Sequence, residues 1–198
     1  MIQYLRGTQD LMLTIDPGEH PRWWVDSSYG MHPDTQSHSG ICLTLGKGVA
    51  YSGSRKQKLN TKSSTEVELV AIDDAIGQVL WMHHFLAEQG QYVLTTTIYQ
   101  DNKSMILLAE NGRASSSKRT RHMNVWYYFV TDQIKKGYVK VAFCPTADML
   151  ADFFMKPLKG AIFAHMHDQI LNLPASKHTT CTGVCWEKVK NMTKNEIT

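Results

Sequence analysis

The sequence predicts an α/β fold in which a mixed sheet is flanked by helices. Two observations lead to this prediction. Three short segments rich in β-branched and aromatic residues come first and are joined by short loops, which is typical of an antiparallel meander. From residue 63 onward, strand and helix patterns alternate, which favours further strands in the same sheet with helices covering it. The expected order is βββαβααβα, with a further helix at the end.

The first elements are an N-terminal helix and the meander. Residues 1–19 have an amphipathic helical pattern that ends in the turn DPGEH at residues 16–20. The run RWWVDSS at residues 22–28 is expected to be the first strand. Residues 41–54 (ICLTLGKGVAYSGS) are expected to form two more strands around a tight Gly-Lys-Gly turn.

A long helix follows the meander. Apolar residues recur at helical spacing from residue 63 to about residue 89. Ser63 and Glu66 fit a capping box at its start. Thr65 and Glu68 fit a second capping box two residues further along. We therefore expect this helix to begin at this serine-rich stretch.

The remaining elements alternate between strand and helix patterns. They are a strand at 95–101, a helix at 102–112, an aromatic-rich helix at 117–137, a strand at 138–145, a helix at 146–156 and an amphipathic helix at 159–173. The polar stretch from residue 174 is expected to be a flexible tail.

Composition favours a soluble globular protein of one main domain. The 198 residues are 42% hydrophobic and 20% charged, and no apolar run is long enough for a transmembrane helix. The first residues lack the apolar segment and cleavage site of a signal peptide. A net charge of +3 is too small to identify a nucleic-acid-binding protein by itself.

The four cysteines are too few and too scattered for a disulfide framework, which favours a reducing compartment. Two of them, Cys181 and Cys185, lie close to His178 in HTTCTGVC. Zinc binding there is one interpretation, but three ligands without a fourth or a CxxC knuckle make an incomplete site. A polar tail with spare thiols is the alternative.

Four acids fall at strand ends or helix starts. These are Asp26, Glu68, Asp101 and Asp152. If the strands that end near Asp26 and Asp101 are parallel neighbours, their carboxylates meet at one edge of the sheet. Neighbouring carboxylates that stay ionised need a cation, and Mg²⁺ prefers oxygen ligands. Four carboxylates could hold two Mg²⁺ ions about 4 Å apart, which is the arrangement for in-line displacement at a phosphodiester. Each acid alone is equally consistent with a turn former or helix cap.

The long helix distinguishes Glu68 from Glu66. At about 100° per residue, Glu68 lies about 60° from the mean direction of the apolar stripe, whereas Glu66 lies about 100° from it. Glu68 is therefore expected on the flank that meets the sheet. Glu66 is expected to point outward and to cap the helix. Asp148 and Asp152 lie one turn apart on the same face of the helix expected at 146–156, and Asp148 is near the start of that helix.

Five motifs, in order, carry a family resemblance. SSTEVEL (63–69), QDN (100–102), RTRHMN (119–124), CPTADMLAD (144–152) and FMKPL (154–158) resemble the SSTEAEY, CDN, RTKHID, VPTEEQLAD and LTKPL of copia-type (Pseudoviridae) LTR retrotransposon polyproteins. The resemblance is to their ribonuclease H domain and covers roughly residues 1–171. Residues 2–15 are similar to the segment where the reverse transcriptase ends, so they are expected to pack less well without that partner.

The resemblance implies a ribonuclease H-like fold with a five-stranded mixed sheet in the order 3-2-1-4-5. It divides the chain into residues 1–20 from the end of the reverse transcriptase, a ribonuclease H-like domain at 21–173 and a tail at 174–198. It also implies cleavage of the RNA strand of RNA/DNA hybrids with two Mg²⁺ ions, or Mn²⁺ in their place. The catalytic, metal-binding residues carried over are Asp26, Glu68, Asp101 and Asp152.

Further positions are expected to contact substrate. They are Ser28, Asn102, Lys118, Arg119, Arg121 and His122. Cations at a helix start oppose the dipole, which a phosphate partner would explain, although a solvated basic turn is the simpler alternative. Asn102 equally fits a helix cap. The chain departs from the family at Ser28, where a second Asp is usual, and at Asn124 and Trp126.

The expected partners are an RNA/DNA hybrid and the reverse transcriptase domain of the same polyprotein, with no membrane. The expected location is intracellular: the cytoplasm, a virus-like particle or the nucleus. Two rival interpretations remain open. One is a catalytically silent domain that binds hybrid or supports the polymerase. The other is an integrase-type transferase, which shares the fold but has its glutamate late in the chain.

Overall fold

Five strands form one mixed sheet in the order β3-β2-β1-β4-β5. In the computed structural model, which describes residues 2–61, 63–91, 93, 95–111 and 124–173, the strands are β1 (Asp16–Ser28), β2 (His38–Lys47), β3 (Val49–Lys56), β4 (Thr96–Gln100) and β5 (Val139–Phe143). The first three are antiparallel neighbours, whereas β4 and β5 run parallel to β1. This order is the one that the resemblance implied.

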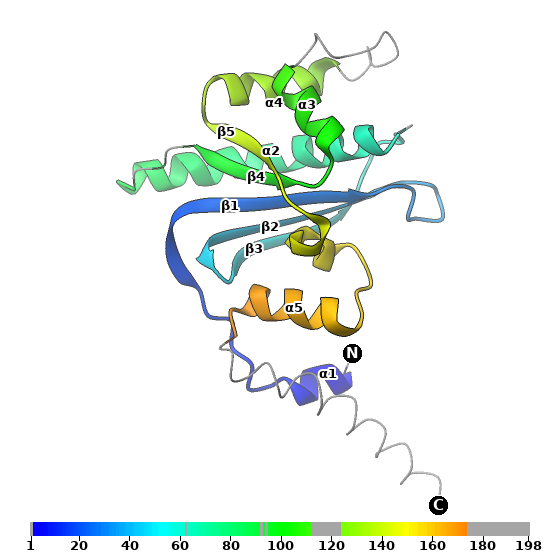
Figure 1. Cartoon of the computed structure of the whole chain (residues 1–198), viewed down its shortest axis with the longest axis vertical. Helices are drawn as coiled ribbons and strands as arrows, with labels where there is room; N and C mark the ends of the chain where they lie inside the picture. The colour runs from blue at the N-terminus through cyan, green and yellow to red at the C-terminus, as the bar shows by residue number, and fades with distance from the viewer. Residues whose placement is uncertain (1, 62, 92, 94, 112–123, 174–198) are drawn as a thin grey trace, which may run out of the picture.

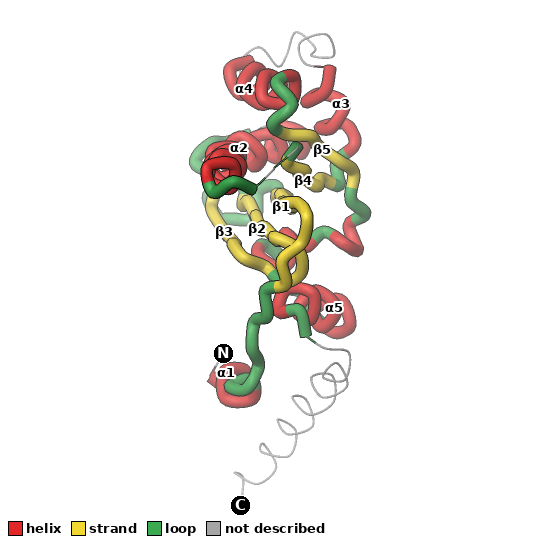
Figure 2. Tube along the Cα trace, turned by 90° about the vertical axis from the view of Figure 1, so that its left-hand side faces the viewer, coloured by secondary structure: helices red, strands yellow, loops and turns green. Residues whose placement is uncertain are grey.

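Helices cover both faces of this sheet (Figures 1 and 2). The helices over the sheet are α2 (Ser64–Glu88), α3 (Lys103–Asn111), α4 (Asn124–Lys135) and α5 (Gly160–Leu171), with two short 3-10 helices, η3 (Thr146–Asp148) and η4 (Leu150–Phe154). The short α1 (Ile2–Gly7) lies beyond α5, away from the sheet. Residues of α2, α3 and α4 form one hydrophobic core with the sheet, and residues of η4 and α5 form a second.

Alternation along β1 divides its side chains between the two cores. Trp23 and Val25 are buried in the core that α2 covers, whereas Trp24 belongs to the core beside η4 and α5. Successive side chains of a strand point to opposite faces, so Asp26 follows Trp24 onto the η4 side. This places the first predicted acid next to the segment that carries the last one.

The long helix α2 has the predicted limits. Ser63 is its N-cap, and its hydroxyl oxygen accepts a hydrogen bond of 3.3 Å from the backbone N–H of Glu66. The apolar stripe is buried against the sheet, with Leu69, Ile72 and Val79 each 0% exposed. Burial of this stripe, rather than helix propensity, fixes the orientation of the helix and therefore the direction of Glu68.

Ile72→Ala is expected to lower the free energy of unfolding by about 2–5 kcal/mol, because it leaves a cavity between α2 and the sheet. Urea titration followed by circular dichroism measures this. Ile162→Ala is the matched control, since Ile162 is 58% exposed on α5 and its truncation should cost less than about 0.5 kcal/mol. Equal losses for the two variants would contradict the packing described here.

Three predicted elements are corrected. β1 begins at Asp16 rather than at residue 22, because the expected turn pairs with the far end of β2, with Asp16 opposite Lys47 and a bulge before Arg22. The N-terminal helix covers only Ile2–Gly7. The helix expected at 146–156 is two 3-10 turns, separated at Met149, whose ψ of 87° is not helical.

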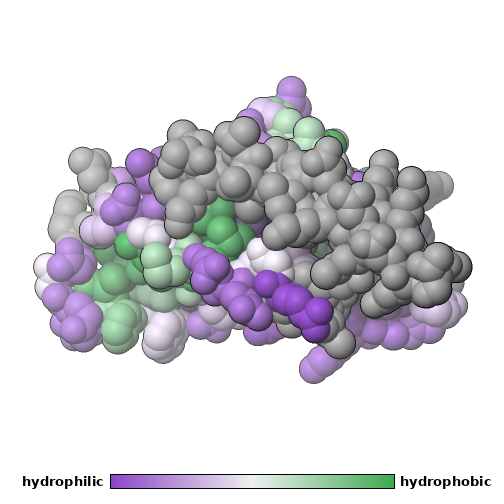
Figure 3. All heavy atoms as spheres, turned by 90° about the horizontal axis from the view of Figure 1, so that it is seen from below, coloured by the Kyte–Doolittle hydropathy of each residue, from purple (hydrophilic) through white to green (hydrophobic). Residues whose placement is uncertain are grey.

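The N-terminal segment lies against α5. The Tyr4 hydroxyl is 2.8 Å from Nε2 of His167, and the Thr14 N–H donates to the Leu171 carbonyl oxygen at 3.1 Å. Between α1 and β1, Met12 is 69% exposed, and Leu13 and Ile15 are exposed as well. Figure 3, seen from this end, shows hydrophobic residues interspersed with polar ones at the surface.

Two further observations concern membrane-spanning helices and cysteine thiols. Among the described helices, none has the length and apolar character needed to cross a bilayer. Cys42 and Cys144 are buried free thiols. His178, Cys181 and Cys185, the residues of the zinc interpretation, lie outside the described residues.

Candidate active site

The parallel pairing of β1 and β4 brings Asp26 and Asp101 to the same edge of the sheet. Trp24 lies opposite Tyr99 in the register of the two strands. Asp26 is two residues beyond Trp24, and Asp101 is two residues beyond Tyr99. Both side chains therefore stand at the carboxyl ends of their strands, where sites form in sheets of this kind. Asp26 is only 2% exposed, and Asp101 is half-buried.

The first turns of α2 bring Glu68 to this edge. One carboxylate oxygen from each of Asp26, Glu68 and Asp101 lies within 4.8 Å of the other two. Glu68 is 6% exposed. Three of the four predicted acids therefore form one cluster, although they come from residues far apart in the chain.

Gln100 connects this cluster to the strand end, and the sequence analysis missed it. Its side-chain Nε2 donates to Oε2 of Glu68 at 2.9 Å, and its Oε1 accepts from the backbone N–H of Asp101 at 2.9 Å. Only this orientation of the amide satisfies both partners. Gln100 is 0% exposed, so it holds Glu68 and Asp101 in a fixed relation. The available signal was a glutamine in QDN where the family has cysteine.

Asp152 stands beside Asp26 but outside the cluster of three. It lies in η4, is 4% exposed, and its Oδ1 is 2.6 Å from Nζ of Lys156. The same ammonium is 3.4 Å from Oδ2 of Asp26. Asp148, the neighbouring candidate, is exposed in η3. The structure thus brings all four predicted acids to one region, in two groups that meet at Asp26.

Gly40 allows η4 to approach the sheet this closely. It lies opposite Asp26 in the pairing of β1 and β2. A Cβ atom at this position would be 2.5 Å from the carbonyl oxygen of Ala151 and 2.6 Å from Cγ of Met155. Any other residue would push η4 away, and Asp152 with it.

Asp101 receives support from the segment after β5. The Thr146 hydroxyl donates to Oδ2 of Asp101 at 3.0 Å. Thr146 begins η3, immediately after Pro145. The hydroxyl thus restrains one carboxylate oxygen of the partly exposed member of the cluster.

Burial and mutual repulsion perturb the acids of this cluster. Burial, hydrogen bonding with the Asp152 carboxyl and the charges of Glu68 and Asp101 raise the pKa of Asp26 to about 9. Burial also raises the pKa of Glu68 to about 7, although the hydrogen bond from Gln100 opposes this. Without a cation, the site therefore keeps protons that isolated carboxyl groups would lose.

These pKa values predict a pH-dependent stability of the metal-free chain. Asp26 loses its proton near pH 3.9 when unfolded, at about the reference value, but near pH 9 when folded, so its stabilising contribution is complete below pH 4 and lost as pH rises towards 9. In EDTA, Tm should therefore fall between pH 5 and pH 9. Asp26→Asn should flatten this slope, and Mg²⁺ should raise Tm more at pH 8 than at pH 6, because it binds deprotonated carboxylates. A Tm in EDTA that rises over this range would contradict the prediction.

The predicted substrate contacts have different outcomes. Ser28 ends β1, is half-buried, and follows Asp26 by two residues. Oδ1 of Asn102 accepts from the Met105 N–H at 3.1 Å and so caps α3, as the alternative interpretation held. The basic positions Lys118, Arg119, Arg121 and His122 lie outside the described residues.

The prediction that Glu66 points outward is wrong. Glu66 is 9% exposed, close to the 6% of Glu68. The segment after β3 lies against the first turn of α2, since Gln57 donates from Nε2 to the Val67 carbonyl oxygen at 3.0 Å. Helical periodicity does not reveal that another segment lies beside this turn. Glu66 nevertheless lies outside the carboxylate cluster of Asp26, Glu68 and Asp101.

The sheet order, the flanking helices and the acids at the strand ends define a ribonuclease H-like fold. The chain is similar to LC11-RNase H1, a protein isolated from compost by a metagenomic approach, with a TM-score of 0.52 at 10% identity over 69% of this chain and 93% of that one. At this identity the likeness concerns the fold. The fold predicted from the motifs is confirmed.

The sequence relatives are retrotransposon polyproteins. The chain is 29% identical over 190 residues to the Retrovirus-related Pol polyprotein from transposon RE2 of Arabidopsis thaliana, which covers 93% of this chain and 13% of that protein. It is 28% identical to the one from transposon TNT 1-94 of Nicotiana tabacum, over 79% of this chain and 12% of that protein. No family model matches. The homologues are thus copia-type Pol polyproteins, and the chain spans about an eighth of their length.

Proposed function

We propose that this chain is an Mg²⁺-dependent endonuclease that cleaves the RNA strand of RNA/DNA hybrids during reverse transcription of a retrotransposon. The observation that carries the proposal is the carboxylate cluster of Asp26, Glu68 and Asp101 at the strand ends of a ribonuclease H-like sheet. Similarity to Pol polyproteins supports the biological setting. In this setting the reverse transcriptase domain of the same polyprotein is the partner, residues 1–20 are its end, and 21–173 form the nuclease.

The donor set of the cluster fits Mg²⁺. All three groups offer carboxylate oxygens, the ligands that this hard cation prefers. Burial first, and the neighbouring charges after it, raise the pKa values of Asp26 and Glu68, and a divalent cation would offset both effects by favouring the ionised carboxylates. When bound, Mg²⁺ ions supply the activation of a water and the stabilisation of a leaving oxygen in in-line phosphodiester displacement. Mn²⁺ has similar ligand preferences and is the expected substitute.

The chain's own residues orient this site. Asp26 faces both the cluster and Asp152, so it is the carboxylate that two cations would share. Gln100 and Thr146 hold Glu68 and Asp101 through hydrogen bonds of 2.9 and 3.0 Å. Such fixed donors reduce the reorganisation needed when substrate binds.

Recognition of the RNA strand is assigned to groups at the rim of the cluster. The 2′-hydroxyl, which DNA lacks, would bond near Glu68 and so select the strand that is cut. Ser28 and Asn102 would contact the adjoining nucleotide. Lys118, Arg119, Arg121 and His122 would bind phosphates, which position the duplex without reading its sequence.

A hybrid-cleavage assay tests this function. The chain should cut the RNA strand of a labelled RNA/DNA hybrid with Mg²⁺ and should fail in EDTA. It should leave DNA/DNA duplex intact under the same conditions. Asp101→Asn is expected to lose cleavage. Hybrid binding without cleavage in either Mg²⁺ or Mn²⁺ would contradict the proposal and favour a silent domain that supports the polymerase.

A further inference from the structure

Lys156 provides a positive charge inside the acidic site. It follows η4 and lies four residues after Asp152. Its ammonium Nζ is 2.6 Å from Oδ1 of Asp152 and 3.4 Å from Oδ2 of Asp26. The side chains of these two aspartates are 6% and 3% exposed, so the ammonium lies beside two carboxyl groups that are largely removed from water.

The site therefore has two cation positions that share Asp26. One lies among Asp26, Glu68 and Asp101, where three carboxylates converge. The other lies between Asp26 and Asp152, where the ammonium of Lys156 already stands. An ammonium and a divalent cation cannot both occupy the second position, because they compete for the same oxygens and repel each other.

We propose that the Lys156 ammonium occupies the second cation position of this site, and that a second divalent ion binds only when this ammonium withdraws. The inference rests on the proposed function for the role of the acids as metal ligands. The two positions then fill in order. The first ion binds at the three-carboxylate cluster, and the second binds more weakly because it must displace a charge that belongs to the chain.

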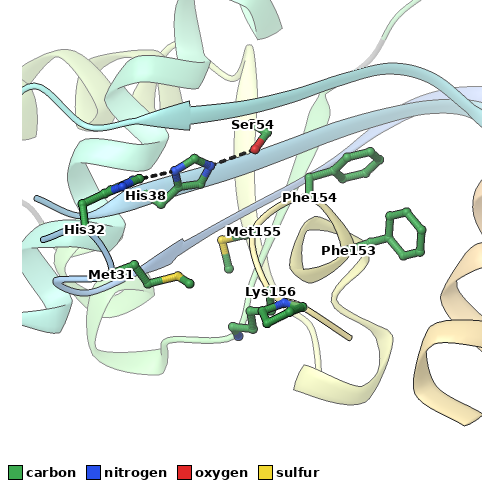
Figure 4. A pocket seen from close by; sticks show the side chains of 9 residues that line it. Met31, His32, His38, Ser54, Phe153, Phe154, Met155 and Lys156 are labelled. Atoms are coloured by element: carbon green, nitrogen blue, oxygen red, sulfur yellow. Dashed lines mark hydrogen bonds between the residues drawn. The ribbon is translucent and has the colours of Figure 1, made fainter. Parts of the chain in front are cut away.

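The neighbouring pocket gives the lysine a place to move to. A pocket of about 410 Å³ adjoins the site, and Lys156 forms part of its wall together with Met155, Phe153 and His38 (Figure 4). The Lys156 side chain is 36% exposed, so it can turn away from Asp152 without unpacking the core. The His38 ring, hydrogen-bonded to Ser54 at 2.8 Å, forms another part of the pocket wall.

Isothermal titration calorimetry of the full chain with Mg²⁺ tests the inference, and Mn²⁺ counted by electron paramagnetic resonance gives the stoichiometry independently. The parent should bind one ion tightly and a second weakly. Lys156→Met should tighten the second ion by about tenfold, the scale of a typical coupling between two sites, and leave the first within about twofold. Lys159→Met removes a charge from an exposed lysine three residues further on and should change neither.

Lys156→Arg and Lys156→Gln distinguish the effect of the charge from the effect of the side chain's shape. Arginine retains the charge, so the second ion should stay weak, whereas glutamine should behave like methionine. Circular dichroism with Mg²⁺ present shows whether each variant is folded. An unchanged second affinity in folded Lys156→Met and Lys156→Gln proteins would overturn the inference. Ordered binding that these variants alter, in a chain that cuts no hybrid, would uphold it while refuting the nuclease proposal.

Discussion

Asp26→Asn is expected to abolish hydrolysis of the RNA strand, with a loss of at least about a thousandfold in kcat/KM, because bound metal ions supply several kcal/mol of transition-state stabilisation. Asp26 is the residue at which the two groups of acids meet, so no other carboxylate can replace it. A fluorescent hybrid-cleavage assay under single-turnover conditions measures the loss.

The stability of the same variant separates chemistry from folding. Asparagine removes a carboxyl group whose pKa the fold raises to about 9, so the metal-free variant should be at least as stable as the parent at pH 8. Asp16→Asn is the control, since Asp16 is exposed at the opposite end of the same strand and should not affect cleavage. Cleavage by Asp26→Asn within tenfold of the parent would remove Asp26 from the metal site.

Glu68→Gln is expected to lower cleavage, whereas Glu66→Gln is expected to lower stability and leave cleavage nearly unchanged. Glutamine at 68 can still accept the hydrogen bond from Gln100 but loses the charge that a cation needs, so cleavage should fall by at least about a hundredfold. Glutamine at 66 should leave cleavage within about twofold and lower Tm, since Glu66 lies in the capped first turn of α2 and outside the cluster.

This pair is informative because burial does not distinguish its members. Glu66 is 9% exposed and Glu68 is 6% exposed, and they are two residues apart on one helix. Only the direction relative to Asp26 and Asp101 differs. Loss of cleavage in Glu66→Gln with normal cleavage in Glu68→Gln would reverse the assignment. Calorimetric titration with Mg²⁺ provides a second readout, since only Glu68→Gln should weaken the first ion.

Periodicity and strand-end positions predicted the main part of the fold. The limits of α2 and the Gly-Lys-Gly turn between β2 and β3 follow from local patterns. They are predictable because burial of one face is repeated over many residues and each repeat reinforces the same interpretation. The convergence of Asp26 with Asp101 required in addition the parallel pairing of their strands, which the family resemblance implied.

Features that depend on a single tertiary contact were not predictable in this way. Gln100 contributes through a hydrogen bond to Glu68 that exists only when α2 lies over the end of β4. Gly40 matters because one backbone oxygen, that of Ala151, approaches it. The charge on Lys156 faces Asp26 only because η4 crosses that strand end. No repeated pattern in the sequence marks any of these residues.

The pairing of β1 with β4 also determines when, during synthesis of the chain, the carboxylate site can form. The two strands are separated by the whole of α2, and the last acid follows β5. A ribosome that has translated Asp26 needs on the order of ten seconds more to reach Asp152. Until β4 has been made, β1 can pair only with β2, and the emerging chain lacks the cluster of three carboxylates; Asp152 joins them later, with η4. Synthesis itself thus delays the appearance of any metal-dependent activity until almost the whole fold is present.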